Sequence, residues 1–227
     1  MKNISLLFVM LILIPVWVFF SPQSSSSSCS VLQTDHNQIA VLPGISTLHA
    51  YPPAVGILSN AVNCLNCHID NGPWKDNDNL IIDIIDKQTQ KSFKQPDGSF
   101  LIDARRGEKT SLLTVIGYKK DVEQPMPERN AWLYIDPATI GNNALSKFAP
   151  GWDVDLPMSC RITGDNLSGY ENAKITCLPM TILPLESARN AQIDLQVMLT
   201  SGESVKAIPS QGMLGNYFVR KVTLRVQ

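Results

Sequence analysis

The feature that most constrains the fold is a series of short β-branched and aromatic segments, separated by glycine and proline, after residue 79. The segments with this character are 80–85, 99–104, 111–118, 131–135, 152–162, 173–183, 191–199 and 217–226, and the segment 152–162 is expected to be a long strand with a proline break at Pro157. The last alternates most clearly, with apolar side chains at Phe218, Val222, Leu224 and Val226. Strands at this spacing, with turn residues between them, predict an antiparallel β-sandwich of immunoglobulin-like type over residues 79–227.

The N-terminal residues 1–28 have the form of an export signal followed by a serine-rich linker. Lys2 gives a short positive start, and residues 4–20 are uncharged and almost wholly apolar. This run lies at the lower length limit of a membrane-spanning helix, so an uncleaved N-terminal anchor is the alternative. Residues 29–50 are expected to be a linker, in which Cys29 is either lipidated or unmodified. The predicted location is therefore periplasmic or otherwise extracytoplasmic.

The charge balance excludes one class of partner. The formal net charge is −1, and no short window is strongly basic. Binding to nucleic acid needs a concentrated positive field, so nucleic acid is not an expected partner. Contact with a membrane is expected only through the N-terminal anchor.

Residues 51–78 contain the motif Cys64-Leu65-Asn66-Cys67-His68. On a helix, side chains three and four residues apart share a face, so both thiols and the imidazole point the same way. Two thiols at this spacing can add across the two vinyl groups of one haem, and the adjacent histidine can reach its iron. The pattern predicts a haem-attachment segment over residues 51–78.

The residues around the motif predict that it lies on a short helix. Tyr51-Pro52-Pro53 is a helix start, and Asn71-Gly72-Pro73 ends the helix. Two other interpretations of the cysteines are weaker. A structural zinc site needs a second pair of ligands, and Cys160 and Cys177 are distant and widely spaced. A redox C-x-x-C pair is expected between a strand and a helix, which is not the context here.

On these residues the segment resembles the c-type cytochromes. The resemblance implies one covalent haem c, held by Cys64 and Cys67, with His68 as the proximal iron ligand. It covers about residues 51–74, because the small cytochromes c continue as helical domains and this chain does not. The expected fold is mainly β, with a short N-terminal haem-bearing helix before the immunoglobulin-like sandwich.

Met126 is the expected second iron ligand. It lies between Pro125 and Pro127, which stiffen the loop and can hold the thioether at a fixed position. The small cytochromes c often carry their distal methionine beside a proline. Several alternatives stay open. They are the histidines His36 and His49, an open coordination position, and the methionines Met158, Met180, Met198 and Met213, of which Met198 is expected in the core.

Cys160 and Cys177 fall in successive predicted strands of an exported domain. A disulfide between them is the expected state of such a pair. Two buried free thiols are the alternative.

Together these features predict a monohaem c-type cytochrome that transfers electrons in the periplasm to a redox partner protein, alone or as a subunit of a larger redox complex. An electron carrier is expected rather than an enzyme, since the sequence has no nucleophile motif. Two alternatives remain. One is a haem enzyme or gas sensor with an open distal site, and the other is a β-sandwich assembly module with a structural haem.

Overall fold

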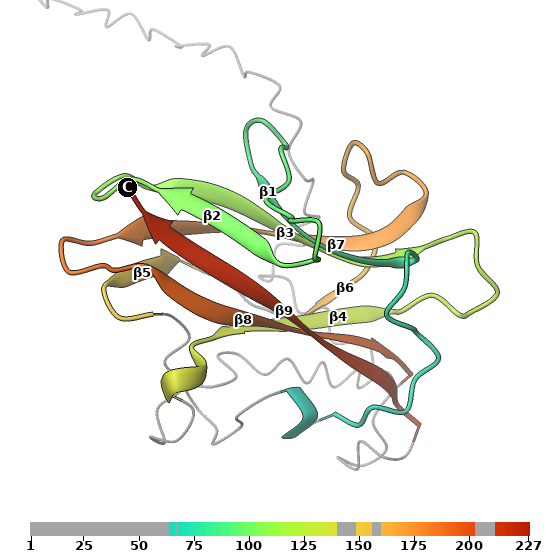
Figure 1. The fold of residues 1–227 in the computed structure, drawn as a ribbon. Coiled ribbons are helices and arrows are strands. Elements are labelled where there is room, and N and C mark those ends of the chain that lie inside the picture. The colour runs from blue at the N-terminus through green and yellow to red at the C-terminus, as the bar shows by residue number, and fades with distance from the viewer. Residues whose placement is uncertain (1–63, 67, 140–148, 156–159, 203–211) are drawn as a thin grey trace, which may run out of the picture.

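The computed structural model describes residues 64–66, 68–139, 149–155, 160–202 and 212–227 (Figure 1). The predicted export signal, the 29–50 linker, the start of the 51–78 segment and Cys67 lie outside the described residues. Within the described part of the chain, no helix is long and apolar enough to cross a membrane.

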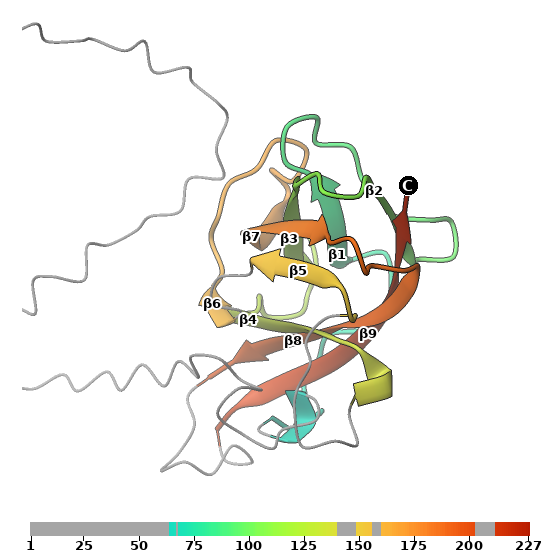
Figure 2. The ribbon, with the colours of Figure 1, turned by 90° about the vertical axis from the view of Figure 1, so that its left-hand side faces the viewer.

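The described chain is mainly β and forms two sheets that pack face to face (Figures 1 and 2). Its strands are β1 (Leu80–Asp86), β2 (Phe100–Ala104), β3 (Thr110–Lys119), β4 (Arg129–Ile135), β5 (Trp152–Asp155), β6 (Cys160–Ile162), β7 (Ala173–Pro184), β8 (Ala191–Ser201) and β9 (Leu214–Val226). Two short 3-10 turns, η1 (Cys64–Asn66) and η2 (Pro137–Thr139), precede β1 and follow β4.

The first sheet has the strand order β1-β3-β7-β5, and the second has the order β2-β9-β8-β4-β6. Neighbouring strands are antiparallel except for β2 and β9, which run parallel with Phe100 opposite Val222. The prediction of a wholly antiparallel sandwich is therefore wrong at this edge. Parallel strands need a crossover connection, and β2 and β9 are joined through the whole remainder of the domain.

The segment 152–162, predicted as a long strand with a break at Pro157, forms two strands that belong to different sheets. β5 pairs with β7 in the first sheet, whereas β6 pairs with β4 in the second. Pro157, which has no backbone N–H to give to a ladder, lies between them in the sequence. The division places Cys160 and Cys177 in different sheets. Cys160 has a free thiol, so the predicted Cys160–Cys177 disulfide is not formed.

The core lies between the two sheets and is built from alternate residues of their strands. Its largest fully buried side chains include Ile82 of β1, Ile116 of β3 and Phe100 of β2. Trp132 and Tyr134 of β4 supply large aromatic surfaces from the second sheet. Removing this apolar surface from water provides most of the free energy that holds the two sheets together.

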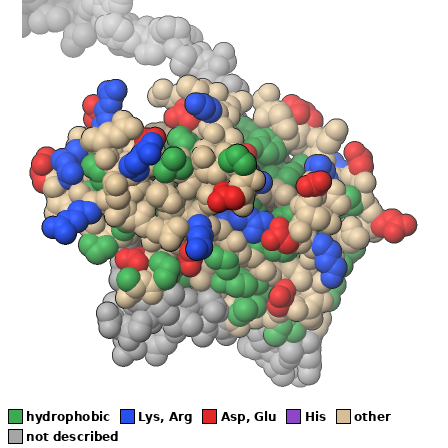
Figure 3. All heavy atoms as spheres, viewed as in Figure 1, with side chains coloured by type: hydrophobic (Ala, Val, Ile, Leu, Met, Phe, Trp, Pro, Cys, Tyr) green, Lys and Arg blue, Asp and Glu red, His purple; other side chains and the backbone are tan. Residues whose placement is uncertain are grey.

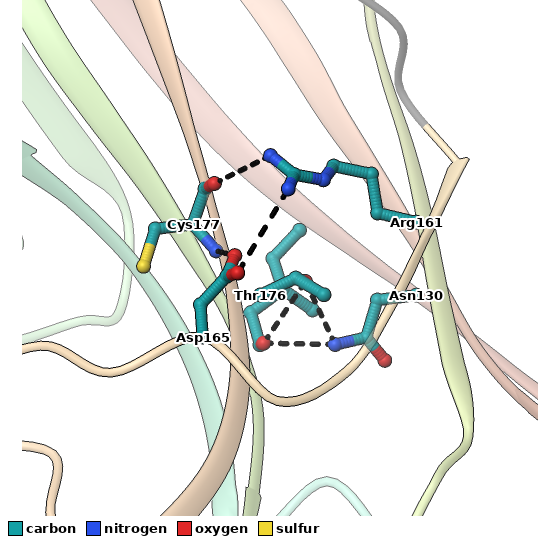
Figure 4. A network of polar contacts seen from close by, with 6 residues as sticks. Asn130, Arg161, Asp165, Thr176 and Cys177 are labelled. Atoms are coloured by element: carbon teal, nitrogen blue, oxygen red, sulfur yellow. Dashed lines mark hydrogen bonds and ion pairs between the residues drawn. The ribbon is translucent and has the colours of Figure 1, made fainter. Parts of the chain in front are cut away.

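A polar network joins the sheets near β6 (Figure 4). Asp165 accepts a hydrogen bond from the Cys177 backbone N–H at 2.7 Å, and its other oxygen lies 3.8 Å from the Arg161 guanidinium. Arg161 in turn donates to the Cys177 carbonyl at 3.1 Å. Beside them the Asn130 amide donates to Thr176 Oγ1 at 3.0 Å. The network therefore links β4 and β6 of one sheet to β7 of the other.

Asp165→Asn is expected to lower the free energy of unfolding by about 1 kcal/mol, because a neutral acceptor replaces a charged one. Urea unfolding measures the change. The matched control is Asp103→Asn, which removes the charge from the exposed pair of Asp103 and Arg225. The loss at Asp165 should persist in about 1 M sodium chloride, where exposed pairs are screened. A loss at Asp165 that disappears in salt would contradict the network.

Candidate functional site

Cys64, the first motif residue, lies on the outer face of the second sheet. The η1 turn sits beside β4 and β8, on the side away from the first sheet (Figures 1 and 2). Cys64 is only 6% exposed and packs with Leu133 and Ile135 of β4 and Met198 of β8. We call these four residues the Cys64 cluster. The half-buried Tyr217 packs against it from β9. The thiol of Cys64 is thus held in apolar surroundings.

A backbone hydrogen bond joins Cys64 and His68. The His68 backbone N–H donates to the Cys64 carbonyl at 3.0 Å, the i to i−4 spacing that an α-helix also uses. Only Cys64–Asn66 is helical among the described residues of segment 51–78, so the longer predicted helix is not confirmed.

The His68 ring is partly buried and has the thioether of Met213 beside it. Its Nδ1 lies 3.2 Å from Met213 Sδ. Burial lowers the pKa of His68 below its ordinary value of about 6.5, so the imidazole is neutral at pH 7. Neutral imidazole is the form that binds a metal ion. The neutral His68 ring can therefore act as a metal ligand.

The residues after His68 are fastened to the beginning of β9. Asp70 accepts hydrogen bonds from the Asn216 side-chain amide at 2.9 Å and from the Tyr217 backbone N–H at 3.2 Å. The Asn71 side-chain oxygen accepts from the Gly215 N–H at 3.0 Å. We call this set of bonds between residues 70–74 and 213–217 the β9 clamp. It fixes the position of the chain that leaves the motif.

Two glycines allow the clamp to close. The Gly72 N–H donates to the Gly215 carbonyl at 2.6 Å. A Cβ atom on Gly72 would lie 2.6 Å from Asn216 Oδ1. On Gly215 it would lie 2.6 Å from Met198 Cε and 2.7 Å from the Ile69 carbonyl oxygen. Side chains at either position would force the two segments apart, so glycine is needed here for close approach.

Tyr217 borders the site with a protonated hydroxyl. Burial, followed by electrostatic interaction with Cys64 and Asp194, raises the pKa of Tyr217 to about 12. The phenol therefore stays neutral at physiological pH and can donate a hydrogen bond. Tyr217 could not be selected from the sequence, because alternation along β9 marks it only as a strand residue.

Met126, the predicted distal ligand, packs against the core between the sheets. The carbonyl of the preceding Pro125 accepts a hydrogen bond from the Trp74 indole at 2.8 Å, which ties this loop to the segment after His68. The methionine that the structure brings against His68 is Met213. Of the alternative ligands, Met198 is buried in the Cys64 cluster, which confirms its predicted place in the core. His36, His49 and Met158 lie outside the described residues.

Two potential donor groups are described at the motif. Cys64 supplies a thiol bordered by apolar side chains, and His68 supplies a neutral imidazole beside the Met213 thioether. Among the described residues, no group of three or more His, Cys, Asp and Glu side chains could hold a metal ion.

Cys64 and His68 could be found from their spacing in the sequence, but their partners on β9 were missed. Met213 and Gly215 are separated from the motif by more than two thirds of the domain, and nothing in their local sequence marks them as its neighbours. Comparison with other proteins adds no relative from which such partners could be inferred. No protein-family model matches the chain, and no curated protein sequence is significantly similar to it.

Proposed function

We propose that this protein is a monohaem c-type cytochrome that transfers electrons in the periplasm, alone or as a subunit of a larger redox complex. The observation that carries the proposal is the Cys64-Leu65-Asn66-Cys67-His68 motif, whose first cysteine and histidine are joined by a backbone hydrogen bond. When bound, haem supplies a one-electron iron(III)/iron(II) couple whose potential is set by its ligands and its burial.

Each motif residue has a separate role in the proposal. Cys64 and Cys67 hold the porphyrin through two thioether bonds, and the neutral His68 ring ligates its iron. The Cys64 cluster excludes water from one attachment point, because Leu133, Ile135 and Met198 surround it. Met126 remains the proposed second iron ligand, with its loop tied to Trp74 through the Pro125 carbonyl.

A redox partner protein is the proposed recipient of the electrons. The export signal supports an extracytoplasmic location, with a membrane contact only through an uncleaved N-terminal anchor. Figure 3 shows acidic and basic side chains interspersed on one face, so this face carries no field of a single sign. Partner docking by charge steering is therefore not proposed for it.

The fold is proposed to be immunoglobulin-like in its strand order. Immunoglobulin sandwiches place strands A, B, E and D in one sheet and strands C, F and G in the other. The orders β1-β3-β7-β5 and β9-β8-β4 support this assignment, with β1 as A, β3 as B and β9 as G. The haem-bearing turn would then be an N-terminal addition packed on the outer face of the sheet that contains β9.

The proposal is tested on the full chain produced in cells that export it and attach haem. Acid-acetone extraction is expected to leave haem with the wild-type polypeptide. The double variant Cys64→Ser/Cys67→Ser is expected to lose all covalent haem, whereas the matched control Cys160→Ser keeps it, because Cys160 has a free thiol and is not part of the motif. Complete release of haem from the wild-type chain, or zinc as the sole bound metal, would contradict the proposal.

The rate of carbon monoxide binding distinguishes an electron carrier from a haem enzyme or gas sensor. A six-coordinate haem is expected in the carrier, and its reduced form should bind carbon monoxide poorly. Met126→Ala should open the distal position and make binding fast. Fast binding by the wild-type protein would favour the haem enzyme or gas sensor. Unchanged slow binding in Met126→Ala would assign the distal position to another residue.

A further inference from the structure

We propose that Met213 is the positioning residue of His68. Its thioether accepts a hydrogen bond from the imidazole Nδ1–H and so leaves Nε2 as the nitrogen with the free electron pair. The assignment of the proton rests on the structure of the polypeptide. Its consequence for iron rests on the proposed function.

The direction of this hydrogen bond follows from the chemistry of the two groups. His68 Nδ1 and Met213 Sδ are 3.2 Å apart. A thioether has no proton to give, so the imidazole must be the donor. A neutral imidazole carries one ring proton. With that proton on Nδ1, Nε2 is unprotonated and can bind a metal ion.

The β9 clamp holds both partners of this contact. The Met213 carbonyl accepts a hydrogen bond from the Asn71 side-chain amide at 3.4 Å. Further along the two segments, Gly72 and Gly215 are joined by their backbone bond at 2.6 Å. His68 is joined to Cys64 through its own backbone N–H. The ring and the thioether are therefore brought together by backbone that is fixed on both sides.

A thioether is an unusual partner for a ligating histidine. Such histidines commonly donate to a carboxylate, a backbone carbonyl or water, and these strong acceptors raise the basicity of the ligand. Sulfur is a weak acceptor. The His68 ring therefore donates less electron density to iron(III), and this raises the reduction potential above that of the same site with an oxygen acceptor.

Two substitutions at residue 213 separate acceptor strength from packing. Met213→Gln places an amide oxygen near Nδ1 and should lower the reduction potential. Met213→Leu retains apolar bulk without an acceptor and should raise it. Disturbed packing alone would move both variants in the same direction. Shifts of the same sign, or no shift in either variant, would overturn the positioning role.

The ring proton is located independently by nitrogen NMR of labelled histidine, on the full chain produced without haem attachment, at about pH 8, above the ordinary histidine pKa. The wild-type chain and Met213→Gln should show a protonated Nδ1 and an unprotonated Nε2. Met213→Leu should move the proton toward Nε2. An unchanged Nδ1–H tautomer in Met213→Leu would overturn the inference. If wild-type chains attach no haem, the proposed function is wrong. The tautomer of His68 measured by NMR still tests the role of Met213, because this measurement needs no haem.

Discussion

Trp74→Ala is expected to lower the free energy of unfolding by about 3–5 kcal/mol, the usual cost of removing a buried tryptophan side chain. Trp74 is 1% exposed and belongs to the core between the sheets. Its indole donates to the Pro125 carbonyl at 2.8 Å, and its backbone N–H donates to Asn216 Oδ1 at 2.8 Å. One residue thus joins the segment after the motif to the core and to the loop that contains Met126.

Trp74→Phe is the matched variant, since it retains a buried aromatic ring and loses the indole hydrogen bond. It should cost less than the alanine variant, with about 1 kcal/mol assigned to the lost bond. Urea unfolding gives both values. Equal and small losses in the two variants would show that Trp74 does not anchor the segment in the core. A phenylalanine variant as unstable as the alanine variant would place the main contribution in the hydrogen bond.

Most strands could be predicted because each has its own pattern of apolar residues. The predicted segment 173–183 matches β7, and 191–199 lies within β8, because alternate residues of both face the core. The parallel pairing of β2 with β9 could not be predicted in this way. The pairing of two strands that are distant in sequence depends on how both pack on the core of the complete domain. The pattern of residues within either strand does not determine this pairing.

The chain at residues 152–162 is divided between the two sheets. β5 and β6 each satisfy the local requirements of a strand, but the chain between them passes from one sheet to the other. A disulfide needs its two Cα atoms within about 7 Å and its Cβ atoms facing one another. Proximity in sequence suggested this for Cys160 and Cys177, but it does not fix the relative position of strands in different sheets, and Cys160 keeps a free thiol.

The candidate site was predictable only where its chemistry is local. Cys64 and His68 are selected by a five-residue motif, because helical geometry would bring its residues to one face. Met213 and Gly215 belong to the site through the β9 clamp, which forms only when the sandwich is complete. Gly215 lies within β9 and not in a turn. Glycine is needed there because the neighbouring atoms leave no room for a Cβ atom.

Gly215→Val is expected to open the β9 clamp and to lower the free energy of unfolding by about 1–3 kcal/mol, the typical cost of overpacking. The added Cβ would lie 2.6 Å from Met198 Cε and 2.7 Å from the Ile69 carbonyl oxygen. The methionine methyl group can move aside at small cost. The carbonyl oxygen belongs to the backbone of the motif segment, so residues 69–72 must shift as a unit.

Hydrogen exchange locates this change. The Gly72 amide, bonded to the Gly215 carbonyl at 2.6 Å, should exchange faster in Gly215→Val, while amides of β3 in the first sheet stay protected. Leu214→Val is the matched control, because it places valine one residue away at an exposed position of the same strand. It should change stability by less than about 0.5 kcal/mol. Since the shift also separates Met213 from His68, Gly215→Val should release the Nδ1–H tautomer. A protected Gly72 amide with unchanged stability would show that the two segments do not meet through their glycines.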